Sequence, residues 1–184
     1  MFLPLLLALQ IAVAPMPELA PGAKYDPKIP TIKQVLGHES GEVITPPEDV
    51  ATYLRALNQA APDRTRLVEY ARSWEGRPLW LFIIGSPERI ARLDQVKADL
   101  RRLADPRGVS PADADRLVRD LPVVTWLMHG VHGNEISSSD AALAATFSSR
   151  NGKEGWRIPS VAQVRRCRAP LRLMPHLLLV TCKF

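Results

Sequence analysis

Apolar and polar positions between residues 47 and 121 follow helical and strand periods in turn. The first helix is expected to end near Ala61, with Thr45 as a candidate N-cap, because apolar residues recur at helical spacing at Val50, Tyr53, Leu54 and Leu57. Ser86 and Ser110 each stand directly before a proline, which is typical of a helix start. We expect a second helix from Ser86 to about Ala104 and a third, shorter one after Ser110, with its apolar side at Leu117 and Val118.

Three apolar segments predict strands. Residues 66–73 alternate and residues 79–84 are apolar throughout, and the turn 74–78 between them indicates a hairpin. Residues 122–128 have apolar side chains on both faces of a strand, which is expected of a central strand covered by helices on both sides. This mixture of elements predicts an α/β fold.

Candidate chemistry follows directly after the third strand, in the stretch from His129 to Glu135. Functional groups of open α/β sheets gather at the carboxyl ends of strands. His132 and Glu135 are three residues apart, so a helical first turn or a tight loop brings imidazole and carboxylate to one side, where they can share a cation such as zinc. The alternative is that His132 bonds a loop carbonyl and Glu135 complements a helix dipole.

Residues 127–143 resemble the first zinc-ligand motif of the M14 family of zinc metallocarboxypeptidases, especially its bacterial members. Segments 30–38, 45–49 and 70–78 fit the same family, so the resemblance covers about residues 25–145. It implies an α/β/α sandwich with a mixed sheet, present here in part, and zinc-dependent hydrolysis at the C-termini of peptides or proteins. It also implies that His132 and Glu135 are the first two Zn²⁺ ligands.

The family's third zinc ligand and its general-base Glu are expected well beyond Phe184, and its substrate-carboxylate motif is not found. His176 does not fit as a ligand. We therefore expect a truncated carboxypeptidase that is inactive as written. The alternatives are a non-enzymatic secreted binding module and a basic-tailed interaction protein.

The net charge of +5 comes from the C-terminal part of the chain, since residues 150–184 hold eight Lys and Arg against one acid. This Arg- and Pro-rich tail has two candidate origins, an out-of-frame translation and a natural basic arm. Only Trp156 and Phe184 accompany the basic residues, so we do not expect nucleic-acid binding. Cys167 and Cys182 also lie here and are expected as free thiols, with a disulfide after export as the alternative. We expect the tail not to pack on the α/β segment.

Residues 2–14 form an apolar run that has the length of a signal-peptide core and is too short to span a membrane. A buried N-terminal helix is the alternative. We expect a signal peptide over residues 1–20, a Pro-rich linker or N-terminal extension over 21–46, and the carboxypeptidase-like segment over 47–149. The protein is then secreted or periplasmic.

Overall fold

The structure is a computed structural model that describes residues 26–151 and 176–182. The expected signal peptide, the Arg cluster of the tail and Cys167 lie outside the described residues. Within them, no helix is long and apolar enough to cross a membrane.

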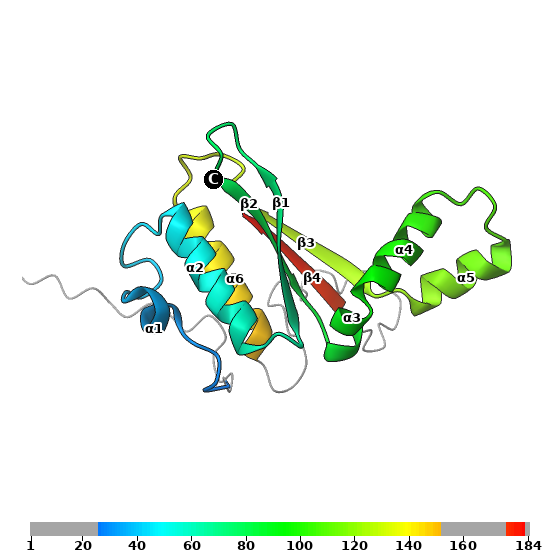
Figure 1. The fold of residues 1–184 in the computed structure, drawn as a ribbon, viewed down its shortest axis with the longest axis horizontal. Coiled ribbons are helices and arrows are strands. Elements are labelled where there is room, and N and C mark those ends of the chain that lie inside the picture. Colours follow the sequence, from blue (N-terminus) through cyan, green and yellow to red (C-terminus); the bar gives the residue numbers. More distant parts are fainter. Residues whose placement is uncertain (1–25, 152–175, 183–184) are drawn as a thin grey trace, which may run out of the picture.

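The centre of the fold is a four-stranded sheet (Figure 1). Its strands are β1 (Thr65–Arg72), β2 (Pro78–Ile84), β3 (Val123–His129) and β4 (His176–Cys182), in the order β1-β2-β4-β3. The pairs β1–β2 and β2–β4 are antiparallel, whereas β3 and β4 are parallel. The sheet is therefore mixed, and the expected hairpin of β1 and β2 is confirmed.

One face of the sheet is covered by α1 (Ile32–Leu36), α2 (Pro47–Ala60) and α6 (Ser137–Asn151) (Figure 1). The larger core lies here, and its fully buried members include Tyr53, Leu57, Phe82 and Leu143. The Tyr53 hydroxyl donates a hydrogen bond to the carbonyl of Pro30 at 3.0 Å. Ile29 and Ile32 are also buried in this core, and Val35 and Leu36 pack against it, so residues 29–36 of the expected linker lie on the domain.

The other face carries α3 (Pro87–Ala91), α4 (Leu93–Ala104) and α5 (Pro111–Asp120). Ile83 of β2 packs there with Ile90 and Val96, whereas its neighbours Phe82 and Ile84 belong to the first core. This alternation along β2 gives the sheet helices on both faces, so the expected partial α/β/α sandwich is confirmed.

The helix starts at Ser86 and Ser110 are confirmed, since each hydroxyl accepts a backbone N–H three residues on. The single helix expected after Ser86 is instead two helices, broken at Arg92, where φ is −106° and ψ is 21°. Val118 is exposed, contrary to expectation, while Leu117 is buried. The N-cap of α2 is Pro46 rather than Thr45 and makes no side-chain cap bond.

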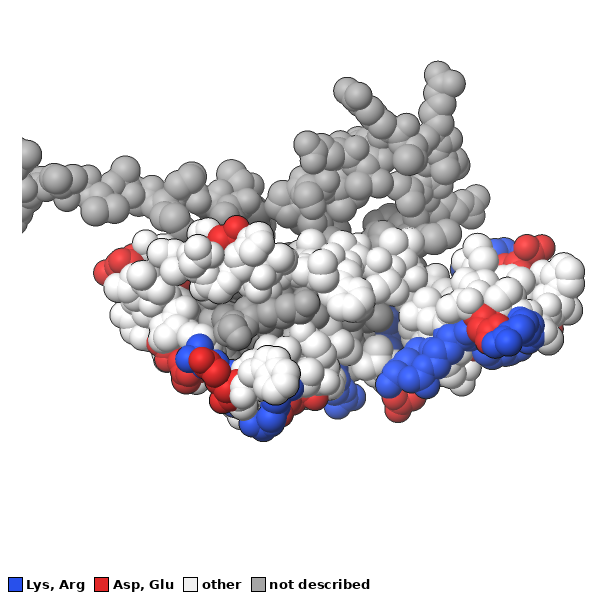
Figure 2. Space-filling model, turned by 90° about the horizontal axis from the view of Figure 1, so that it is seen from above, with Lys and Arg blue, Asp and Glu red and all other residues white. Residues whose placement is uncertain are grey.

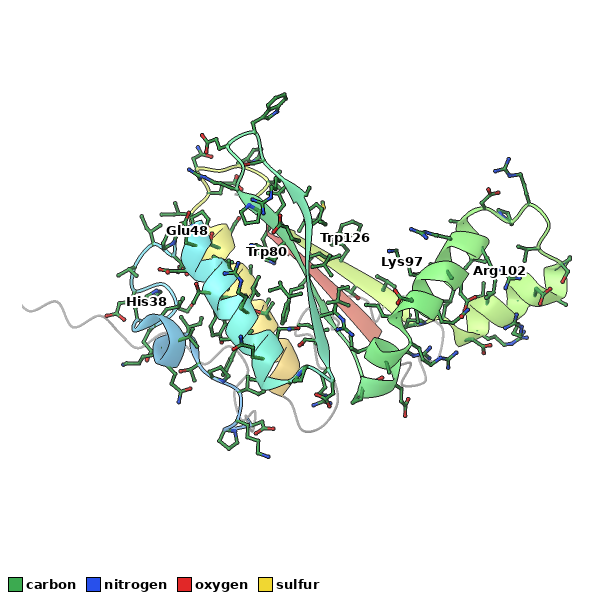
Figure 3. All side chains as sticks on the ribbon, in the orientation of Figure 1. His38, Glu48, Trp80, Lys97, Arg102 and Trp126 are labelled. Atoms are coloured by element: carbon green, nitrogen blue, oxygen red, sulfur yellow. The ribbon has the colours of Figure 1, made fainter. Side chains whose placement is uncertain are left out.

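The third strand was predicted to be a central strand covered by helices on both sides, and this is wrong for the described sheet. β3 lies at an edge, and Trp126 and Met128 on it are 60% and 59% exposed. The Trp126 side chain is labelled in Figure 3. Helices α3–α5 cover only the end of β3 near Val124, while Leu127 packs on the core of the opposite face.

The expectation that the tail does not pack is also wrong for residues 176–182. They form β4, which lies between β2 and β3. Our expectation rested on the composition of the whole tail. The short apolar run Leu177–Val180 within it has the pattern of a buried strand.

Candidate metal site

The residues expected to bind metal lie in the loop between β3 and α6. β3 and β4 are parallel, so this loop leaves β3 at the end of the sheet where β4 also ends. Gly130, the first loop residue, has φ +73°, a left-handed conformation that glycine adopts without steric cost. The chain can therefore turn sharply as it leaves the strand.

His132 and Glu135 are brought together as expected. The Nδ1 atom of His132 lies 2.8 Å from Oε1 of Glu135. The backbone N–H of Glu135 donates to the carbonyl of His132 at 3.2 Å, so a tight turn sets their spacing. The helix α6 begins only at Ser137, so the pair lies in the loop before the helix and not on its first turn.

The His132 imidazole contacts the carboxylate of Glu135, which differs from the alternative of a bond to a loop carbonyl. The two side chains are 67% and 53% exposed. A contact between two side chains this exposed contributes little to folding stability, because water competes for both groups. The nitrogen and oxygen can therefore turn from each other to a cation at little cost in stability.

Zinc accepts imidazole nitrogen and carboxylate oxygen, so this donor set fits two of its ligands. In the described part of the chain, no group of three or more His, Cys, Asp or Glu side chains is placed to hold a metal ion. The pair is a partial ligand set.

His129, the last residue of β3, is a feature to which sequence analysis assigned no role. Its side chain is half-buried, and this burial lowers the pKa of the imidazole from its usual 6.5. Its Nε2 atom is buried, and no hydrogen-bond partner for it lies among the described residues. The sequence signal that could have indicated a role for His129 was its position at the end of an apolar strand. In the sheet, the residue of β4 that pairs with His129 is Cys182.

The structure thus combines a mixed sheet that has helices on both faces with a His–Glu pair directly after the end of a strand. The family model of zinc carboxypeptidases, peptidase M14, matches residues 50–147. The chain belongs to this family. The match contains both His132 and Glu135, and it ends close to where the resemblance ended in the sequence. No curated protein and no solved structure matches the chain.

Proposed function

We propose that this chain carries part of the zinc site of a metallocarboxypeptidase, which removes residues from the C-termini of peptides. His132 Nδ1 and Glu135 Oε1 are the two ligand atoms in this proposal. The 2.8 Å approach of these atoms supports it most directly, because it lies within the segment that matches the family.

Bound zinc would polarise the scissile carbonyl and lower the pKa of its water. The residues of this chain would hold and orient the ion. The turn closed by the Glu135 N–H and the His132 carbonyl keeps both ligand atoms on one side of the loop. The N–H of Ser138 donates to the carbonyl of Glu135 at 3.0 Å and joins this turn to the start of α6. The loop is thus anchored to β3 at one end and to α6 at the other.

Zinc binding tests the ligand assignment. The full chain is expected to bind zinc weakly in calorimetry, because two ligands from one turn hold a cation less firmly than the usual three or four. His132→Ala and Glu135→Gln should each abolish this binding. His38→Ala is the matched control, because the Nδ1 atom of His38 lies 3.0 Å from the carbonyl of its neighbour Glu39 and His38 is not part of the candidate site. This variant should leave the zinc affinity unchanged. Tight, stoichiometric binding that survives His132→Ala would contradict the assignment.

We also propose that the chain as written has no measurable turnover. In the described part of the chain, no third side chain joins His132 and Glu135 to hold a metal ion. General acid–base catalysis by a positioned side chain, for which we assign no residue, typically contributes a factor of ~10²–10⁴ in rate. The assay is release of C-terminal residues from a panel of peptides with zinc added, with His132→Ala as control. Zinc-dependent release that disappears in the control would show that residues elsewhere in the chain complete the site, and the proposal of an inactive product would be withdrawn.

A further inference from the structure

A second candidate site lies between the helices of the other sheet face. A cavity of about 360 Å³ opens between α3, the first half of α4 and the second half of α5. This volume lies within the range of small-molecule sites. The cavity is near the start of β3, whereas His132 follows the end of that strand. At ~3.3 Å per residue, Val124 and His129 are roughly 16 Å apart along β3, so the cavity is separate from the candidate metal site.

The walls of the cavity are of two kinds. Its apolar part consists of Val96 and Leu117, which are buried, and Leu121, which is partly buried. The polar part consists of Gln95, four basic residues and three acidic ones, namely Arg89, Arg92, Arg116, Arg119, Glu88, Asp99 and Asp120. Basic and acidic side chains lie next to one another at this end of the molecule (Figure 2).

Two of the four guanidinium groups are already engaged. Arg89 donates to the backbone carbonyl of Asp120 at 3.0 Å. Arg116 pairs with Asp113 at 3.3 Å and with Asp120 at 3.9 Å. Of the acids, Asp99 lies 4.0 Å from Arg102, which is outside the cavity lining.

Arg92 and Arg119 differ from these two. Neither guanidinium has a hydrogen bond or ion pair with another residue of the described chain. Arg92 lies at the break between α3 and α4, and Arg119 in the last turn of α5, so two separate helices present them to the same cavity. They are the groups available to a ligand.

The charges of the lining indicate the charge of that ligand. Four guanidinium groups face three carboxylates, which leaves an excess of one positive charge. A monoanion neutralises this excess, whereas a phosphate-like dianion would leave a negative charge uncompensated. Guanidinium groups bind carboxylates through paired hydrogen bonds. The apolar wall can bury an aliphatic group at the same time.

We propose that this cavity binds a monocarboxylate that carries an apolar side chain next to the carboxylate. Arg92 and Arg119 hold the carboxylate, and Val96, Leu117 and Leu121 contact the side chain. Glu88 and Gln95 can accept hydrogen bonds from an amide N–H of the ligand. Both an N-acylated amino acid and the C-terminus of a peptide have this chemistry. The proposal does not depend on the metal site.

The test uses N-acetyl-leucine, titrated into the full chain without added metal and followed by calorimetry. We expect saturable binding that weakens about tenfold in Arg92→Gln and in Arg119→Gln, which corresponds to ~1.4 kcal/mol per lost charged contact. Arg101→Gln is the matched control, because Arg101 lies on α4 outside the cavity lining. Binding should be unchanged there. An equal loss in the control, or no saturation with the unchanged chain, overturns the proposal.

Three further ligands refine the test. N-acetyl-leucine amide lacks the charge and should not bind, and inorganic phosphate should bind more weakly than N-acetyl-leucine. Equal binding of the amide, or tighter binding of phosphate, overturns the proposal. A pentapeptide ending in leucine distinguishes the two sources. If it binds as well as N-acetyl-leucine, the ligand class includes peptide C-termini, and if it does not, the class is the free acyl amino acid.

Discussion

The hydroxyl of Thr45 donates a hydrogen bond of 2.5 Å to the carboxylate of Asp140, a residue 95 positions further along the chain. Thr45 is only 2% exposed. Asp140 lies in the first turn of α6, where a negative charge also interacts favourably with the helix dipole. The bond joins the segment before α2 to the helix that follows the His132–Glu135 loop.

Thr45→Val is expected to destabilise the protein. The substitution keeps the shape of the side chain but leaves the partly buried Asp140 carboxylate without this donor, which typically costs ~1.5–3 kcal/mol for a bond to a charged group. Urea unfolding measures the loss. Thr52→Val is the matched control, since the Thr52 hydroxyl bonds the carbonyl of Glu48 on the exposed side of α2. A loss no larger than in the control would contradict the role of this bond.

Folding stability should decrease as the pH falls through the usual pKa of histidine. Burial lowers the pKa of His129 in the folded state, so the unfolded state binds more protons between the folded pKa and 6.5. This contribution to stability is fully present above pH 6.5 and is lost as the pH falls towards the folded pKa. Unfolding measured from pH 7.5 to 5 should show a smaller decrease in His129→Gln. An identical pH dependence in the variant would contradict the prediction.

Leu179→Pro is expected to destabilise the sheet. β4 pairs with β2 on one side and with β3 on the other, and proline removes a backbone donor from this inner strand. The free energy of unfolding should fall by at least ~1 kcal/mol, the net contribution of one hydrogen bond. Amide exchange in β3 should become faster. Leu179→Val, which keeps the backbone N–H, is the control. Unchanged exchange in the proline variant would show that β4 does not hold β3 in the sheet.

Export is expected to remove the N-terminus. The apolar run of residues 2–14 and the proline-rich stretch behind it predict cleavage between Ala14 and about Ala20. Mass spectrometry of the protein produced in an export-competent bacterial host measures the mature mass. An intact N-terminus on a cytoplasmic product would be the contrary result.

The sequence by itself determined the local features of this protein. The amphipathic face of α2, the serine caps before α3 and α5 and the turn between β1 and β2 depend on residues within a few positions of one another. The same is true of His132 and Glu135, whose approach depends on a three-residue turn. Short-range periodicity and capping therefore sufficed to predict them, and the resemblance to the family added the prediction that this pair binds zinc.

Only the tertiary structure decided which distant segments meet. The pattern of β3 predicted burial on both faces, yet the strand order places β3 at the edge of the described sheet and gives the inner position to β4. Thr45 was expected as a helix cap, but its hydroxyl bonds Asp140. The cavity that Arg92 and Arg119 line depends on how α3, α4 and α5 pack. In each case, strand order and the packing of segments that are remote in the sequence decide which residues meet. The spacing of residues along the chain does not indicate such long-range contacts.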